Sequence, residues 1–349
     1  MNNSTEQNDI TSHRVDVNKK VSALKQLYKR NSWIFVTAFV GILLIVPILP
    51  FVEGWMAAQG TIILIYVIAA QGQAVLTGYT GLVSMGHGGF LAIGAYTSAL
   101  LTFHYGIDLA VGILAGAVVT GIFGMVLALI FLRLSGAFMA VGTLGFAFFI
   151  GTIVNNIPFF QGRTGISLPA NQIFGIEIGD YGFYYVSVIL FAMVLLFMYS
   201  LTRSGVGRAL MALRDAENAA QSSGVNRWFF RTVGFTVSAS ITGIAGVLSG
   251  HYVNYVSSEV YADIWYSADI LMASVIGGSA MLMGPLIGGT FVVMVPFFLE
   301  RMADFSYIFK GVALIVVLWI APLGVAELIG RPFMRRRAKK LAKARGVIE

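Results

Sequence analysis

Residues 54–107 read GWMAAQGTIILIYVIAAQGQAVLTGYTGLVSMGHGGFLAIGAYTSALLTFHYGI and contain no Asp, Glu, Lys or Arg. This stretch is long enough for two membrane-spanning helices of about 20 residues each. Similar uncharged runs recur along the chain, which is 57% hydrophobic and 11% charged, whereas a soluble domain averages about 25% charged residues. The composition excludes a soluble enzyme, a disordered protein and a nucleic-acid binder, and the unbroken apolar runs disfavour a β-barrel. We therefore predict an all-α fold, a polytopic transmembrane helical bundle in a lipid bilayer.

The same hydropathy pattern predicts the positions of the spans. We expect them at about 33–52, 55–77, 84–103, 109–132, 137–154, 183–201, 232–256 and 307–326. Residues 270–299 are also uncharged, but Gly277-Gly278 and Gly284-Pro285 interrupt them. Many of the 40 glycines stand at small-xxx-small spacing, as Gly94 and Ser98 do, which predicts closely packed helices.

The basic residues predict which side of the membrane each loop occupies. Residues 1–30, 203–231 and 331–349 hold nineteen of the 23 Lys and Arg, and the positive-inside rule makes these segments cytoplasmic. Both termini are then cytoplasmic, so residues 270–299 have to cross the membrane an even number of times. They form either two short helices, for about ten spans in all, or a re-entrant pair beside eight spans.

The predicted organisation has three parts. Residues 1–32 form a basic cytoplasmic N-terminal tail, and residues 329–349 form a basic cytoplasmic C-terminal tail. Between them, residues 33–328 form the transmembrane domain, which includes a cytoplasmic loop at 203–231.

No constellation of residues for catalysis or metal binding is visible in the sequence. The chain has no cysteine and only four histidines, none at metal-ligand spacing, and it lacks the GxxxxGK[ST] phosphate loop. We expect no catalytic residue, no metal, no cofactor and no ATP site in this chain. His87, within Gly86-His87-Gly88-Gly89, is the one ionisable residue expected inside the membrane. It is either a pathway or gate residue or a histidine bonded to a neighbouring backbone carbonyl.

The segment at residues 205–224, GVGRALMALRDAENAAQSSG, predicts one amphipathic helix in the cytoplasmic loop. Leu210, Leu213, Ala216 and Ala220 fall on one face at helical spacing, and Gly224 is placed to end the helix. The helix either lies on the bilayer surface or docks on a cytoplasmic partner. The small residues on this face favour docking, because a stripe that faces lipid usually carries larger groups.

Four ordered stretches together resemble one protein family. They are GYTGLVSMGHGGFLAIGAYTSALL (78–101), LRLSGAFMAVGTLGFAFFIGTIVNN (132–156) with GRTGIS (162–167), GRALMALRDAENAAQSSGVN (207–226) and SVIGGSAMLMGPLIGG (274–289). Over about residues 60–326 the chain is similar to the LivM-type inner-membrane permease subunit of branched-chain amino-acid ABC importers. It departs from the family pattern at 73–75, 147–149 and 162–165, which bears on the solute more than on the transport mechanism.

The resemblance implies a set of partners and a set of functional residues. The partners are a second homologous permease subunit, two cytoplasmic ATPase subunits that bind ATP, and a periplasmic solute-binding protein, all at the bacterial inner membrane. The family's ATPase-coupling loop falls here on Gly207, Arg208, Arg214, Glu217, Ala220 and Gly224. Polar residues that we expect along a solute pathway are Ser84, His87, Tyr96, Thr143, Asn155 and Asn156.

The expected function is inward movement of a small solute by alternating access, driven by the separate ATPase subunits. A branched-chain or other apolar amino acid is the expected solute, and urea, short amides and aromatic acids stay open because relatives move them. The alternative class is an ion-coupled secondary carrier with His87 as its proton site. Against the carrier stands the absence of any Asp or Glu expected within the membrane.

Overall fold

The computed structural model describes residues 41, 43–44, 54–131, 133–134, 136–161, 163–173, 175–261, 263–298, 303–320 and 324–326. The chain divides into two compact units, Phe51–Ala326 and Met1–Pro50 with Glu327–Glu349. Nearly all described residues belong to the first unit, and the fold below is that of this unit. The expected tails at 1–32 and 329–349, and most of the expected span at 33–52, lie outside the described residues.

The described part of the first unit is a helical bundle with four very short strands. Its helices are Gly54–Ala74 (α2), the π-helical Val75–Thr80 (η2), His87–Tyr105 (α3), Leu109–Phe131 (α4), Ala137–Asn156 (α5), the 3-10 turn Pro158–Phe160 (η3), Asp180–Arg203 (α6), Gly205–Asp215 (α7), Glu217–Ser222 (α8), Arg227–Val253 (α9), Ser258–Tyr261 (α10), Ile264–Gly277 (α11), Gly284–Phe298 (α12) and Ala303–Ile320 (α13). Five of them, α2 with η2, α4, α5, α6 and α9, are long and apolar enough to cross a membrane. The predicted helical membrane bundle is thereby confirmed.

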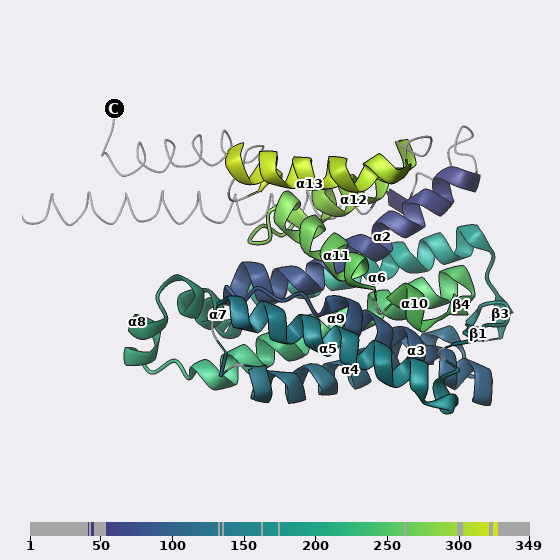
Figure 1. Cartoon of the computed structure of the whole chain (residues 1–349), viewed down its shortest axis with the longest axis horizontal. Coiled ribbons are helices and arrows are strands. Elements are labelled where there is room, and N and C mark those ends of the chain that lie inside the picture. The colour runs from purple at the N-terminus through teal and green to yellow at the C-terminus, as the bar shows by residue number, and fades with distance from the viewer. Residues whose placement is uncertain are drawn as a thin grey trace, which may run out of the picture. The chain divides into compact units, whose positions relative to one another are not determined.

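Two small antiparallel ladders are absent from the sequence-based prediction. Ile166–Ser167 (β1) pairs with Tyr255–Val256 (β4), and Gln172–Ile173 (β2) pairs with Ile176–Glu177 (β3). Figure 1 shows β1, β3 and β4 at one end of the bundle and the short helices α7 and α8 at the opposite end. We call these the outer and the inner end, because the basic loop that contains α7 and α8 is the one predicted to be cytoplasmic.

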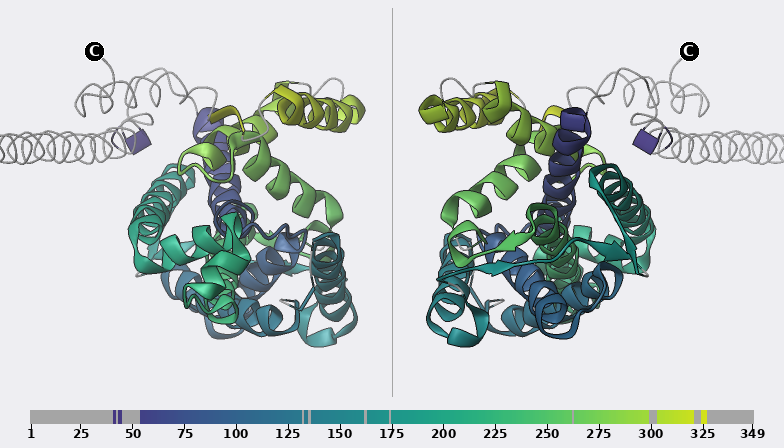
Figure 2. Two further views of the ribbon diagram at one scale, coloured as in Figure 1. Left: turned by 90° about the vertical axis from the view of Figure 1, so that its left-hand side faces the viewer. Right: turned by 90° about the vertical axis from the view of Figure 1, so that its right-hand side faces the viewer.

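Helix α9 is the centre of the bundle and packs along α2, α3 and α4. In the views along the helices, α5 and α6 lie on opposite sides of this central group (Figure 2). A methyl group at Gly94 of α3 would overlap the carbonyl of Gly243 in α9, and one at Gly243 would meet the side chain of Thr120 in α4. The prediction that glycines bring the helices together is confirmed at these contacts.

Helix α3 begins inside the bundle rather than at its inner end. Its first residue, His87, bonds to Ser238, which lies about 16 Å along α9 at 1.5 Å per residue. Residues 81–86 therefore run back from the inner end of η2 to this depth without forming a helix. Gly81 opens this loop in the left-handed region, at φ 72°, where glycine is favoured over other residues.

Helices α11 and α12 are joined by a turn at residues 278–283. The first residues of α11 lie beside Gly88, whose N–H donates to Ser267 Oγ at 2.9 Å. At the other end of α11, the backbone of Ser279 lies against Gly78 of η2. Helix α11 thus runs from the middle of the bundle toward its inner end, and the predicted break near Gly284-Pro285 is confirmed.

Helix α12 returns toward the outer end, where Phe297 stacks on Trp55 at the start of α2 with ring centroids 5.6 Å apart. Gly324, after α13, lies against Gly278, so α13 runs inward again. This path agrees with an even number of crossings in 270–299. Helices of 14 and 15 residues are about 21–23 Å long, shorter than the ~30 Å hydrocarbon core, which favours the re-entrant pair. The total number of spans and the side of each terminus stay predictions.

We expect Gly94→Ala to lower the free energy of unfolding by about 1–3 kcal/mol, because the added methyl group overpacks the contact with Gly243. Gly145→Ala is the matched control, since a methyl group there meets no atom within 4 Å. Thermal unfolding of the purified protein in detergent measures both variants. Equal melting temperatures for the two would contradict the close approach of α3 and α9.

Candidate functional site

The loop at 81–86 is held in place by side chains from neighbouring helices. Gln73 Nε2 of α2 donates to the carbonyl oxygen of Ser84 at 2.8 Å, and the Met85 N–H donates to Thr143 Oγ1 of α5 at 3.0 Å. Inside a bilayer no water is available to the backbone, so such side chains replace the missing helical bonds. Gln73 lies in a stretch where the sequence departs from the resembled family, and here it supports this loop.

His87 is wholly buried and bonded through both ring nitrogens. Its Nε2 lies 2.9 Å from Ser238 Oγ, and the Ser238 hydroxyl donates to the carbonyl of Gly72 at 2.7 Å. Since that hydroxyl proton is already used, Ser238 accepts from His87, and we assign the hydrogen to Nε2. Nδ1 is then the acceptor for the Ser84 hydroxyl, 3.3 Å away. The neutral ring links α2, α3 and α9 through hydroxyl groups, not through the direct backbone bond that the sequence left open.

Three of the six expected pathway residues, Ser84, His87 and Thr143, therefore meet at this loop. Their exposed fractions are 0%, 0% and 2%. In this conformation they form a packed, uncharged polar cluster, which we call the loop cluster, and not the wall of an open channel.

The other three expected pathway residues lie elsewhere. Tyr96 lines an apolar groove of about 610 Å³ between α3, α4 and α5, and its hydroxyl has no hydrogen-bond partner among the described residues. Asn155 and Asn156 are exposed at the outer end of α5, where Asn155 Oδ1 accepts from Ser258 Oγ at 3.4 Å. The structure does not bring the six residues together into one site.

The sequence-based prediction of one continuous cytoplasmic helix over 205–224 is wrong. Helix α7 ends at Asp215, Ala216 leaves helical geometry with φ −154° and ψ 81°, and α8 begins at Glu217. Leu210 and Leu213 are 1% exposed and Ala220 is 6% exposed. Because the chain itself buries Leu210, Leu213 and Ala220, these three residues are not available for docking, whereas Ala216, the fourth residue of the expected face, is exposed.

The predicted coupling residues Gly207, Arg208 and Gly224 define how the two short helices are joined to the bundle. A methyl group at Gly207 would overlap the carbonyl of Leu201, so glycine permits the tight corner between α6 and α7. Arg208 is exposed and donates to the carbonyl of Arg203 at 2.8 Å. Gly224 follows α8 with φ 86°, so the expected glycine stop is confirmed.

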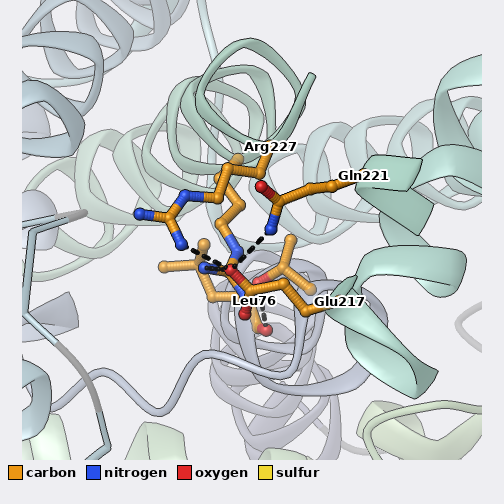
Figure 3. Close-up of polar contacts among 6 residues, drawn as sticks. Leu76, Glu217, Gln221 and Arg227 are labelled. Atoms are coloured by element: carbon orange, nitrogen blue, oxygen red, sulfur yellow. Dashed lines mark hydrogen bonds and ion pairs between the residues drawn. The ribbon is translucent and has the colours of Figure 1, made fainter. Parts of the chain in front are cut away.

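Glu217 ties α8 to the first turns of α9. Its carboxylate accepts from Arg227 Nη1 at 2.8 Å and from Arg231 Nη2 at 2.9 Å. Figure 3 shows Arg227 and Gln221 pointing toward this carboxylate. Partial burial by itself would raise the pKa of Glu217, but the hydrogen bonds and charges of Arg227 and Arg231 outweigh it and lower the pKa below its ordinary value.

Sequence reasoning missed a buried ion pair, and the expectation that His87 is the one ionisable group inside the membrane part is wrong. Lys310 Nζ of α13 bonds to both carboxylate oxygens of Asp269 in α11, at 2.9 and 2.8 Å, and the side chains are 4% and 13% exposed. Lys310 falls inside the expected span 307–326, so the sequence did contain the signal. A charged residue within an apolar span is a functional candidate that usually has a partner.

Among the described residues, no group of three or more His, Cys, Asp or Glu could hold a metal ion.

The second buried histidine, His251, is bonded to uncharged groups. Its Nε2 lies 2.8 Å from Ser98 Oγ, and its Nδ1 lies 2.8 Å from Asn171 Oδ1. Its contacts therefore join α3, α9 and the outer loop.

We expect His87→Ala to lower the free energy of unfolding by on the order of 3 kcal/mol, because it leaves a cavity and removes two buried hydrogen bonds. Melting temperature and the yield of monodisperse protein measure this loss. His87→Gln keeps a polar group at the position, and we expect a smaller loss. Normal stability of His87→Ala combined with a loss of uptake would instead make the imidazole a pathway group.

The stabilisation by Glu217 should depend on pH. Because its folded-state pKa is lowered, the stabilisation is complete above the unfolded pKa of about 4.3 and is lost as pH falls through the folded-state pKa. The melting temperature of the wild type should exceed that of Glu217→Gln above about pH 5, and the difference should shrink in more acidic buffer. Glu177→Gln, at an exposed position of β3, is the control. A difference that grows on acidification would refute the ion-pair assignment.

Comparison with known proteins agrees with this architecture. The family model described as branched-chain amino acid transport system / permease component matches residues 57–318. The high-affinity branched-chain amino acid transport system permease protein LivM of Escherichia coli (strain K12) is 31% identical over 269 residues, which cover 68% of this chain and 63% of that protein. LivM of Salmonella typhimurium (strain LT2) is 32% identical over 244 residues, which cover 62% of this chain and 57% of that protein.

A more distant relative is the D-allose transport system permease protein AlsC of Escherichia coli (strain K12), 29% identical over 140 residues that cover 38% of this chain and 42% of that protein. No solved structure matches. The chain spans less than two thirds of the length of the LivM relatives. The family model covers well over half of this chain, which settles the family. The chain belongs to the family of branched-chain amino acid transport system permease components.

Proposed function

We propose that this chain is a transmembrane permease subunit of an ABC importer, which moves a small solute inward by alternating access. The observation that carries the proposal is the family match over residues 57–318. The sequence contains no phosphate loop, so ATP is bound and hydrolysed by separate cytoplasmic ATPase subunits. The complete importer has a second homologous permease subunit, two ATPase subunits and a periplasmic solute-binding protein. It lies in the bacterial inner membrane with both termini of this chain in the cytoplasm.

The proposed solute is a branched-chain or other apolar amino acid. The names of the two LivM relatives support this choice, whereas AlsC is named for a sugar, so permeases with recognisable similarity carry different solutes. Urea, short amides and aromatic acids are the alternative solutes, which would move by the same mechanism.

The surface proposed to contact an ATPase subunit is the exposed side of α7 and α8. Its exposed residues include the small and uncharged Ala212, Ala216, Asn218, Ala219 and Ser222, beside the charged Arg208 and Asp215. Arg214 and Glu217, two of the expected coupling residues, instead bond to this chain. Small uncharged residues allow close approach of a partner with little loss of hydration.

An ion-coupled secondary carrier is the second candidate, and the observation that favours it is Asp269 within an apolar helix. The absence of acidic residues from the membrane part was the sequence argument against a carrier, and Asp269 removes it. Lys310 neutralises this carboxylate, however, so proton or sodium coupling at Asp269 requires the ion pair to open.

We expect Ala219→Arg to insert normally but to lose co-purifying ATPase and solute-stimulated ATP hydrolysis. The added side chain blocks the docking surface and buries an unpaired charge, which costs several kcal/mol in the complex. Pull-down of the ATPase subunits and uptake into vesicles measure the effect.

Ala170→Arg, at an exposed position of the outer end, is the matched control and should retain the ATPase. Undiminished uptake without ATP in the Ala219→Arg variant would contradict the importer and favour the carrier. Ala220→Arg is unsuitable as a docking test, because Ala220 is buried within the chain and its replacement disturbs folding.

A further inference from the structure

Arg214 connects the cytoplasmic helix α7 to two interrupted stretches of backbone in the membrane part. Its guanidinium donates through Nη1 to the carbonyl oxygen of Gly78 in η2. The stem of the same side chain covers Gly81, where an added methyl group would come within 2.8 Å of Arg214 Cγ. Gly78 in turn lies against the backbone of Ser279, in the turn at 278–283. A single side chain from α7 therefore reaches the point where both interruptions meet.

The Gly78 carbonyl needs a donor because it lies at the end of a helical segment, where carbonyl groups lose their helical partners. The next donors along the chain do not reach it. The N–H groups of Gly81 and Leu82 and the hydroxyl of Thr80 all donate to the carbonyl of Leu76. The cationic guanidinium of Arg214 is the donor to the Gly78 carbonyl. Such a charge-assisted hydrogen bond is stronger than one between neutral groups.

Both interruptions are also fixed from the same side of the bundle by α2. Gln73 Nε2 holds the carbonyl of Ser84, and Gln71 Nε2 holds the carbonyl of Leu282 at 2.7 Å. Helix α2 continues directly into η2, to which Arg214 is bonded. A displacement of α7 that pulls on Gly78 therefore acts on the loop at 81–86 and on the turn at 278–283 together.

We propose that Arg214 is a positioning residue that couples movement of the cytoplasmic segment to the two interrupted stretches, and so sets the geometry of the inner end of the transport path. The inference rests on the proposed function, because the ATPase subunits supply the movement of α7. In this role Arg214 acts through the Gly78 carbonyl of its own chain and contacts no partner.

The test uses the complete importer reconstituted in vesicles, with Arg214→Gln and Arg214→Lys compared. In Arg214→Gln we expect normal insertion and normal ATPase association, but about tenfold less solute moved per ATP hydrolysed, because the charged donor is lost. Lysine keeps a cationic donor, so Arg214→Lys should recover a large part of this ratio. Asp215→Asn is the matched control, since it removes only the 2.8 Å pair with Arg214 Nε and should keep the wild-type ratio.

Hydrogen–deuterium exchange on the isolated permease subunit tests the linkage without any ATPase. In Arg214→Gln, exchange should rise about tenfold in residues 76–86 and in residues 278–284 together, whereas Asp215→Asn should leave both unchanged. Unchanged exchange in either stretch, or a normal ratio of solute to ATP in Arg214→Gln, overturns the inference. Wild-type uptake that needs no ATP overturns the importer instead, and the exchange result then decides on the linkage separately.

Discussion

Backbone amide and carbonyl groups inside a bilayer have no water to bond, so a chain that leaves helical geometry there has to supply the partners itself. Among the residues that the structure describes, two such places occur, at residues 81–86 and 278–283. Gln73 and Thr143 satisfy groups of the first, and Gln71 satisfies a carbonyl of the second. Much of the buried polarity around α2 is explained by this requirement.

Some side chains of the cytoplasmic helices α7 and α8 contact the rest of this chain, and the others lie on the surface. Arg214 and Glu217 turn inward, toward η2 and the start of α9, and Leu210 and Leu213 are buried beneath α7. The exposed surface that remains combines small uncharged residues with the charged Arg208 and Asp215. The inward groups fix the position of α7 and α8 on the bundle. An ATPase subunit bound as proposed above would therefore act on the membrane part through a preorganised joint and not through a loose loop.

Asp269 and Lys310 are charged residues within apolar helices, and each neutralises the charge of the other. Either charge alone in an apolar helix would be costly, but the two-oxygen contact compensates both and joins α13 to α11. Because Ser267 of α11 also accepts a hydrogen bond from Gly88, the residue after His87, the pair links the last described helix to the centre of the bundle. The position of α13 therefore depends on an interaction in which neither partner can be removed singly without leaving a charge uncompensated.

The sequence by itself determined the elements that hydropathy, charge and glycine encode. The long helices α2, α3, α4, α5, α6 and α9, the break before Gly284-Pro285, the glycine stop at Gly224 and the resemblance to the permease family were all predictable, because each depends on local composition or on a local backbone requirement. Only the tertiary structure decided which side chains meet. It joined His87 to Ser238 and Gly72, buried the face of Leu210 and Ala220, and paired Asp269 with Lys310. Those contacts connect residues far apart in the chain. Helical periodicity specifies which residues share a face, but the packing of other helices decides what that face contacts.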